Sequence, residues 1–296
     1  MAKIGFIGTG VMGAAIAGHL MAAGNELFVY NRTKSKTDEL VKSGATYCET
    51  PKLVAENAEI IFSMVGYPAD VREIYFGQNG IFASSNLTGK ILIDMTTSEP
   101  GLAIEIAEAA EKVDAHSLDA PVSGGDIGAK NATLTIMVGG DETIYNHVLP
   151  LFEKIGKTMM WQGNAGAGQH TKMANQIGIA GTMTAMTELM VYADKAGLDM
   201  DKVLTTLGGG GASTWSLSNY APRILAEDFT PGFFVKHFIK DLGIALAEAE
   251  KMGIELPATA NAKKLYDLLA ADGFENDGTQ ALIKLFWLDG HRPSNG

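Results

Sequence analysis

The sequence has little cysteine, little proline and no run of basic residues. Its single cysteine, Cys48, cannot form an internal disulfide, and Met1-Ala2-Lys3 leads into a strand-like segment instead of an apolar signal stretch. We therefore expect a reducing, cytoplasmic location. The 23 Lys and Arg against 34 Asp and Glu give a formal net charge of -11, so nucleic acid is not an expected partner.

Long apolar runs are also missing. The longest uncharged stretch, Met173 to Thr187, is shorter than the roughly twenty apolar residues of a membrane span. It predicts a helix buried among protein neighbours, and no membrane partner. The six histidines show no ligand spacing, so no metal site is expected. With 46% hydrophobic and 19% charged residues, the composition is that of a globular protein with one or two domains.

The first half of the sequence alternates strand-like and helix-like segments. The expected strands are 3–7, 27–30, 60–64 and 91–94, and the expected helices are 11–23, 36–43, 69–76 and 101–112. This alternation predicts a parallel sheet with helices on both faces. Further strands expected at 116–120, 133–138 and 158–161 extend the sheet beyond six strands.

The second half contains no strand-like run of note. The expected helices are 169–196, 201–207, 236–252 and 257–271, and the first of them is rich in glycine and alanine. We therefore predict an α/β Rossmann-type doubly wound sheet in residues 1–164, followed by an all-α domain in residues 165–296.

A glycine motif lies between the first predicted strand and the first predicted helix. Gly8-Thr9-Gly10-Val11-Met12-Gly13 fits the pattern G-x-G-x-x-G. In this pattern the first glycine permits a tight turn, the second lets the backbone approach a pyrophosphate, and the third packs helix against strand. The amides at the helix start supply the anion site, so the motif predicts a bound dinucleotide.

The end of the second predicted strand carries no acidic residue. Enzymes that bind NAD usually hold the ribose hydroxyls with a carboxylate there, whereas this chain has Asn31, Arg32 and Thr33. Arg32 is suited to pair with a 2′-phosphate, with hydrogen bonds from Asn31 and Thr33. NADP is therefore the expected cofactor, and NAD is the alternative.

Two further segments carry polar groups suited to a small anionic substrate. Residues 119–125 place the Ser123 hydroxyl before Gly124 and Gly125, and residues 166–172 open the long helix. Lys172 stands on an apolar helix, and burial lowers the pKa of an ammonium group, which makes such a lysine a usable proton donor. Taken in isolation, Asp119 is interpreted as a strand-end cap, and Lys240-Asp241 is interpreted as a surface ion pair.

With these motifs in view, the sequence resembles the β-hydroxyacid dehydrogenase family over its whole length. The resemblance rests on residues 5–13, 119–125, 166–176, and on Pro231-Gly232-Phe233 followed by Lys240-Asp241-Leu242. It implies a Rossmann domain plus a helical domain, with Lys172 as catalytic acid or base. It also implies that Ser123 and Gly124 contact the substrate carboxylate.

The resemblance also implies cofactor contacts, and it leaves one substrate contact open. Met64, Val65 and Thr97 would contact the cofactor, and Lys240 would lie near the nicotinamide. The commonest family pattern has Asn four residues after the lysine, whereas here that position is Gln176 and Asn175 comes three after. This form looks like the tartronate semialdehyde reductase branch, while residues 31–33 look like the NADPH-using semialdehyde reductases. Either amide would orient the substrate.

The predicted function is an NAD(P)-dependent oxidoreductase. It would transfer hydride between NADP(H) and a short β-hydroxy acid or its semialdehyde, of the 3-hydroxyisobutyrate or 2-hydroxy-3-oxopropionate type. The alternatives are a succinic semialdehyde or glyoxylate reductase of the same family and a non-catalytic dinucleotide-binding protein. The family and the small residues of the long helix favour a homodimer or homotetramer.

The predicted site residues fall into three groups. The catalytic group is Lys172, Ser123 and Asn175; the cofactor group is Gly8, Gly10, Met12, Gly13, Asn31, Arg32, Thr33, Met64, Val65, Thr97 and Lys240; the substrate group is Ser123, Gly124, Gly125, Lys172, Gln176 and Phe233.

Overall fold

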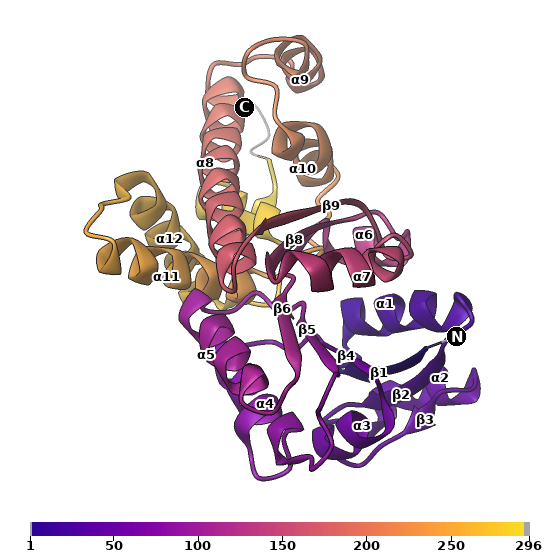
Figure 1. Ribbon diagram of the computed structural model, residues 1–296. Coiled ribbons are helices and arrows are strands. Elements are labelled where there is room, and N and C mark those ends of the chain that lie inside the picture. Colours follow the sequence, from indigo (N-terminus) through magenta and orange to yellow (C-terminus); the bar gives the residue numbers. More distant parts are fainter. Residues whose placement is uncertain (1, 293–296) are drawn as a thin grey trace. The chain divides into compact units, whose positions relative to one another are not determined.

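The computed structural model describes residues 2–292, and of Asp289 only the backbone. The chain divides into two compact units, Met1–Lys172 and Met173–Gly296. The division falls within the long helix α8 (Ala167–Lys195; Figure 1). The boundary expected from the sequence lies between residues 164 and 165, and it instead places all of α8 in the second domain.

Among the described residues, the first unit contains one sheet of nine strands. They are β1 (Lys3–Ile7), β2 (Glu26–Tyr30), β3 (Thr46–Tyr47), β4 (Ile60–Ser63), β5 (Ile91–Asp94), β6 (His116–Asp119), β7 (Val122–Ser123), β8 (Leu134–Gly140) and β9 (Gly156–Gly163). Their order is β3-β2-β1-β4-β5-β6-β8-β7, and β9 pairs with β8. The strands from β3 to β6 are parallel. This order, which changes direction at β1, confirms the predicted doubly wound Rossmann-type sheet.

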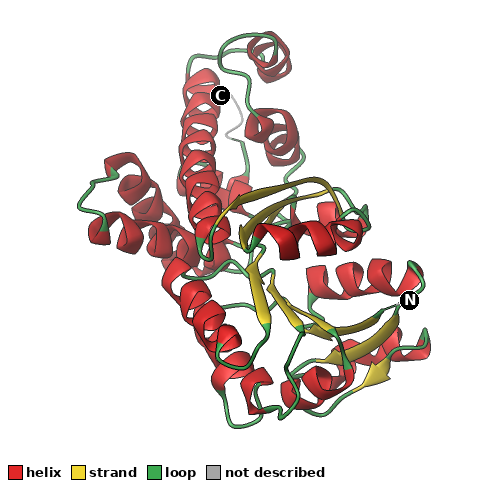
Figure 2. Cartoon of the chain, in the orientation of Figure 1, coloured by secondary structure: helices red, strands yellow, loops and turns green. Residues whose placement is uncertain are grey.

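Helices cover both faces of the sheet (Figure 2). One face packs α1 (Val11–Ala22), α2 (Asp38–Lys42), α6 (Gly125–Lys130) and α7 (Glu142–Phe152), and the other packs α3 (Pro51–Asn57), α4 (Pro68–Phe76) and α5 (Pro100–Glu111). Phe6 of β1 belongs to the buried cluster that contains Ile16 of α1. The next residue, Ile7, belongs to the cluster that contains Val54 of α3. Because both faces are buried at β1, β4 and β5, these strands are mostly apolar runs without polar alternation.

The far end of the sheet differs from the parallel arrangement predicted by the alternation. β8 pairs antiparallel with both β6 and β7, and parallel with β9. A parallel connection requires a crossover of a dozen or more residues, whereas β7 is joined to β8 only through the short α6. The two-residue strands β3 and β7 are too short for a periodic pattern, which is why the sequence did not predict them.

The second unit is helical in its described part, as predicted. It contains the rest of α8 together with α9 (Met200–Gly208), α10 (Trp215–Leu225), α11 (Val235–Lys251) and α12 (Pro257–Leu269), followed by short turns of helix. Met183, Met186 and Met190 of α8 belong to one buried cluster with Ile224 and Trp287, and Ala180 belongs to another with Phe238 and Tyr266. α10 was not predicted. Within residues 2–292 there is no helix with the length and apolar character that a membrane crossing requires.

Candidate active site

The glycine loop closes tightly against neighbouring strand ends. Gly8 has a φ of +97°, and a Cβ placed on it would lie 2.1 Å from the Met64 carbonyl oxygen. A Cβ on Gly13 would lie 2.0 Å from the Gly8 carbonyl oxygen. Both positions therefore exclude any side chain, as the motif predicts for the turn and for the packing of helix against strand.

Gly10 differs from these two glycines because it faces open space. No atom lies within 4 Å of a Cβ placed on it. Gly10 is also the N-cap of α1, a helix start that has neither a side-chain cap nor an acidic residue in its first turn. Amides of the first helical turn, with the positive end of the helix dipole, form an anion site. The half-buried Met12 lies in this first turn. The loop thus fits the pyrophosphate of a dinucleotide.

The side chains of Asn31 and Arg32, which follow β2, make different contacts. The Asn31 side chain is engaged in the loop itself, accepting from the Thr9 amide at 3.0 Å and donating to the Thr33 carbonyl at 2.9 Å. The Arg32 side chain is 84% exposed and pairs with Asp70 at 2.9 Å. Arg32 is thus an accessible cation beside the loop, while Asn31 braces the loop. The sequence offered no indication of Asp70, which lies 38 residues further on.

The other predicted cofactor residues of this unit follow β4 and β5. Met64 donates its amide to the Ile7 carbonyl at 2.8 Å, and the Val65 amide donates to the Thr96 hydroxyl at 3.0 Å. Met64, Val65 and Thr97 are all partly exposed. Since the carboxyl ends of parallel strands share one edge of the sheet, these residues share that edge with the glycine loop, where ligands of doubly wound sheets bind.

The Ser123-Gly124-Gly125 segment turns sharply between β7 and α6. Gly124 and Gly125 have φ values of +125° and +62°, which favour glycine at both positions. Ser123 is partly exposed and Gly124 is exposed. The turn therefore leaves a hydroxyl and a side-chain-free backbone accessible at its surface.

Lys172 lies beside this turn and is only 5% exposed. Its ammonium group donates to the Val122 carbonyl oxygen at 2.9 Å. The structure thus brings together two residues 50 positions apart, and places the Lys172 ammonium next to the residue that precedes Ser123. A buried ammonium beside an accessible hydroxyl and glycine backbone is suited to bind an anion and to transfer a proton.

Two buried polar side chains hold the start of α8. The Asp119 carboxylate accepts from the amides of Gly166 and Gln169, each at 2.8 Å. The Gln169 side chain accepts from the Ser98 amide at 2.9 Å and donates to the Thr96 carbonyl at 2.7 Å. Burial raises the pKa of Asp119 to about 6, against the lowering effect of its amide hydrogen bonds. The sequence did not single out Gln169, because its partners are more than 70 residues earlier.

Three of the remaining predicted site residues, Asn175, Gln176 and Lys240, form a chain of polar contacts in the second unit together with Asp241. The Asn175 amide donates to the Gln176 side-chain oxygen at 2.7 Å, and the Gln176 amide donates to Asp241 at 2.6 Å. Asp241 also pairs with Lys240 at 2.9 Å, with side-chain exposures of 1% and 12%. The expectation of a surface ion pair at these two residues is therefore wrong, because α11 faces inward at Asp241. Phe233, which is partly exposed, stacks edge-on against Phe238.

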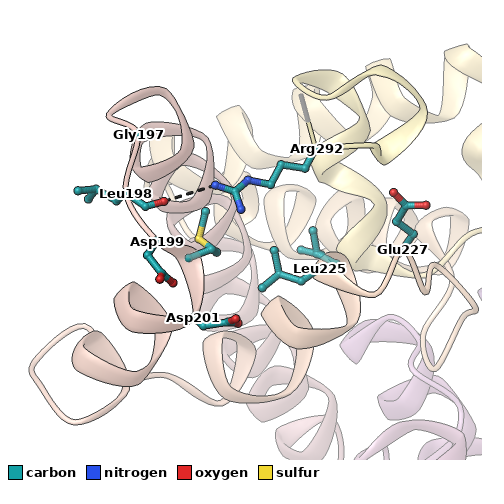
Figure 3. Close-up of a pocket in the computed structure, with 9 residues that line it drawn as sticks. Gly197, Leu198, Asp199, Asp201, Leu225, Glu227 and Arg292 are labelled. Atoms are coloured by element: carbon teal, nitrogen blue, oxygen red, sulfur yellow. Dashed lines mark hydrogen bonds between the residues drawn. The ribbon is translucent and has the colours of Figure 1, made fainter. Parts of the chain in front are cut away.

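A cavity in the second unit does not include any of these residues (Figure 3). It has a volume of about 630 Å³ and lies between the start of α9 and the end of α10. Two of its charged side chains make contacts within the fold: Asp199 caps α9 through the Lys202 amide at 3.2 Å, and Arg292 pairs with Asp194 at 2.5 Å.

Family models match both halves of the chain. A family model described as the NAD binding domain of 6-phosphogluconate dehydrogenase matches residues 3–163. A second, described as NAD-binding of NADP-dependent 3-hydroxyisobutyrate dehydrogenase, matches residues 166–286. The first match lies within residues 1–164 and the second within residues 165–296.

Individual relatives match along nearly the whole chain. An uncharacterized oxidoreductase of Bacillus subtilis is 53% identical, over 96% of this chain and 98% of the relative. The 2-hydroxy-3-oxopropionate reductase of Escherichia coli is 40% identical, over 95% and 96%. A solved structure of Mycobacterium tuberculosis 3-hydroxyisobutyrate dehydrogenase with L-serine has a TM-score of 0.88 at 28% identity, over 96% and 99%. The chain belongs to the β-hydroxyacid dehydrogenase family of NAD(P)-dependent oxidoreductases.

Proposed function

We propose that this protein reduces a short semialdehyde to the corresponding β-hydroxy acid with NADPH, and catalyses the reverse oxidation. The observation that carries the proposal is the position of the buried Lys172 ammonium. It lies 2.9 Å from the carbonyl oxygen of Val122, the residue that precedes Ser123 in the chain. Such a group is positioned to transfer a proton to an oxygen of a small substrate bound at that turn.

The chain's own residues account for binding and proton transfer. The Ser123 hydroxyl and the Gly124 backbone hold the substrate carboxylate. Lys172 donates a proton to the carbonyl oxygen during reduction and recovers it from the hydroxyl during oxidation. The nicotinamide cofactor, held by the glycine loop, supplies or accepts the hydride. Met64, Val65, Thr97 and Lys240 complete its contacts.

Asn175, not Gln176, is the amide that we propose to orient the substrate. The Gln176 side chain is fully buried and engaged at both ends, by Asn175 and by Asp241. Asn175 is partly exposed and uses its amide nitrogen as the donor to Gln176. Its side-chain oxygen is therefore the group that remains suited to a ligand.

The names of the relatives support a three-carbon or four-carbon substrate with a carboxylate. One relative is a 2-hydroxy-3-oxopropionate reductase, and another was solved with L-serine, which is itself a β-hydroxy acid. Phe233, which is partly exposed in the second unit, would contact the substrate's carbon skeleton. A succinic semialdehyde or glyoxylate reductase differs from this proposal in the position of the carbonyl, which is γ to the carboxylate in succinic semialdehyde and α to it in glyoxylate.

Consumption of NADPH with a panel of aldehydes tests the proposal. The panel contains 2-hydroxy-3-oxopropionate, methylmalonate semialdehyde, succinic semialdehyde and glyoxylate. We expect the highest kcat/KM with one of the first two. A preference for succinic semialdehyde or glyoxylate would favour the alternative reductase. No turnover of any member, with NADPH still bound, would favour a non-catalytic dinucleotide-binding protein.

Arg32 is the residue on which we base the preference for NADP. Replacing it with alanine removes a charge-assisted contact to the 2′-phosphate, so NADPH affinity should fall by about 1.5 to 3 kcal/mol, or roughly 10- to 150-fold, while NADH affinity stays constant. Fluorescence titrations with both cofactors measure this. Arg72→Ala is the control, because Arg72 is an exposed arginine of the same unit that pairs with Glu105. An unchanged cofactor ratio in Arg32→Ala would contradict the assignment.

We also propose a homodimer or homotetramer that acts in the cytoplasm. Ala174, Gly178, Gly181 and Ala185 are exposed along one face of α8, and added Cβ atoms at the two glycines would meet nothing within 4 Å. Small residues at this spacing allow the helix of a second copy to approach closely.

The buried free thiol of Cys48 supports the proposal of a reducing compartment.

A further inference from the structure

The long helix α8 is capped by a residue from a distant strand. Asp119, at the end of β6, is 4% exposed and binds the amides of Gly166 and Gln169 with its two carboxylate oxygens. Gly139 and Gly168 leave space for this carboxylate, since Cβ atoms on them would lie 2.5 and 2.8 Å from its oxygens. Three separate segments of the first unit, at residues 119, 139 and 166–169, therefore take part in this contact.

Helix capping alone does not require this arrangement. α3, α7, α9 and α10 are capped by their own adjacent residues, Thr50, Asp141, Asp199 and Thr214. Asp119 is instead 47 residues from the amide of Gly166. Its carboxylate is buried next to Asp94, its partner in the β5–β6 register, and burial and this neighbour both raise the pKa of Asp119. Burial of a charge is unfavourable, and a local Ser or Thr cap would avoid it.

The distant cap has a geometric consequence that a local cap lacks. Gln169, which binds Asp119, is three residues before Lys172, less than one helical turn. The Lys172 ammonium in turn binds the carbonyl of Val122, three residues after Asp119. One short segment, residues 119–122, therefore holds both the backbone of this turn and the ammonium that it carries.

We propose that Asp119 is a positioning residue for Lys172. By binding the first turn of α8, its carboxylate sets the height and rotation of the helix relative to the Ser123 turn, and thereby the place of the ammonium. The proposal rests on the proposed function, in which Lys172 transfers the proton. Asp119 itself contacts neither substrate nor cofactor.

The test compares two carboxylate caps of the same unit. Asp141 is the matched control, because it caps α7 through the amides of Thr143 and Ile144, at 2.7 and 3.0 Å, and is exposed. Turnover of the best aldehyde, NADPH affinity and melting temperature are measured for Asp119→Ala, Asp119→Asn and Asp141→Ala. All assays are run well below the lowest melting temperature.

We expect Asp119→Ala to lower kcat by roughly 10- to 100-fold, the effect of a displacement of about 1 Å in a catalytic group. NADPH affinity should stay within about threefold of wild type, because the glycine loop is untouched. The kcat of Asp119→Asn should fall between those of wild type and Asp119→Ala, since its amide oxygen still accepts one hydrogen bond. Asp141→Ala should lower the melting temperature without lowering kcat.

A double variant identifies the route of the effect. If Asp119 acts through Lys172, Asp119→Ala should not lower kcat further in a Lys172→Ala background. Three results would overturn the inference. The first is a full additional loss of kcat when Asp119→Ala is added to Lys172→Ala, and the second is a kcat for Asp119→Ala equal to that of Asp141→Ala. The third is a loss of NADPH affinity in Asp119→Ala that parallels its loss of kcat. Full activity of Lys172→Ala alone would instead overturn the proposed function, so the two failures are distinguishable.

Discussion

Replacing Lys172 with alanine should lower turnover by about 10²- to 10⁴-fold, the usual contribution of positioned acid-base catalysis. NADPH affinity should change little, because the glycine loop lies at a different part of the unit. Lys172→Met, which retains most of the side-chain volume but carries no proton, should be as inactive as Lys172→Ala. Lys172→Arg should also fail, since a guanidinium does not release its proton in a protein. Stopped-flow turnover and a melting curve for each variant are the measurements.

Lys90 provides a matched control for this experiment. It is another buried lysine of the first unit, 8% exposed, and its ammonium donates to the carbonyls of Ala55 and Glu56. Lys90→Met should therefore lower stability without lowering turnover. Substantial activity in Lys172→Arg would mean that Lys172 supplies only charge. Substantial activity in Lys172→Ala or Lys172→Met would remove it from the chemistry.

Gly10→Val should weaken NADPH binding by about 100-fold or more and leave the fold intact, because the new side chain would occupy the space that a pyrophosphate needs. Gly10 has φ and ψ of -71° and -166°, which valine adopts readily, and a Cβ there meets no protein atom within 4 Å. Valine is a poor N-cap, so a destabilisation of about 1 kcal/mol is expected. NADPH fluorescence titration and thermal melting measure the two effects separately.

Gly18 provides the control for Gly10, since it lies in the same helix and also has no atom within 4 Å of an added Cβ. Gly18→Val should bind NADPH normally. Gly8→Ala and Gly13→Ala should instead lower the melting temperature, because their Cβ atoms would overlap backbone oxygens at 2.1 and 2.0 Å. Normal NADPH affinity in Gly10→Val would show that the cofactor does not approach the loop at this residue.

Local pattern explains the success of the fold prediction. The apolar runs at β1, β4 and β5 are long enough to show that both faces of each strand are buried, and helices separate them along the chain. The antiparallel pairing of β8 was not predictable in the same way, because strand direction depends on the path of the connection.

The candidate site was predictable where a residue type is unusual for its setting. A lysine on an apolar helix, a serine before two glycines and the glycine loop all met this criterion. The residues that hold the start of α8, Asp119 and Gln169, did not meet it, because a buried Asp or Gln cannot be distinguished in sequence from an exposed one. Asp241 illustrates the difference, because it reads as half of a surface pair but is 1% exposed and engages both Lys240 and Gln176.

The sequence by itself determined the class of fold, the glycine loop and the cation on the long helix, because each depends on spacing within a few turns of chain. Only the tertiary structure decided which polar groups are already engaged: Asn31 within the loop, Gln176 by Asp241, and Asp119 at the start of α8. These contacts join residues 22 to 65 positions apart. Separations of this size are set by the packing of whole strands and helices, and local sequence does not encode them.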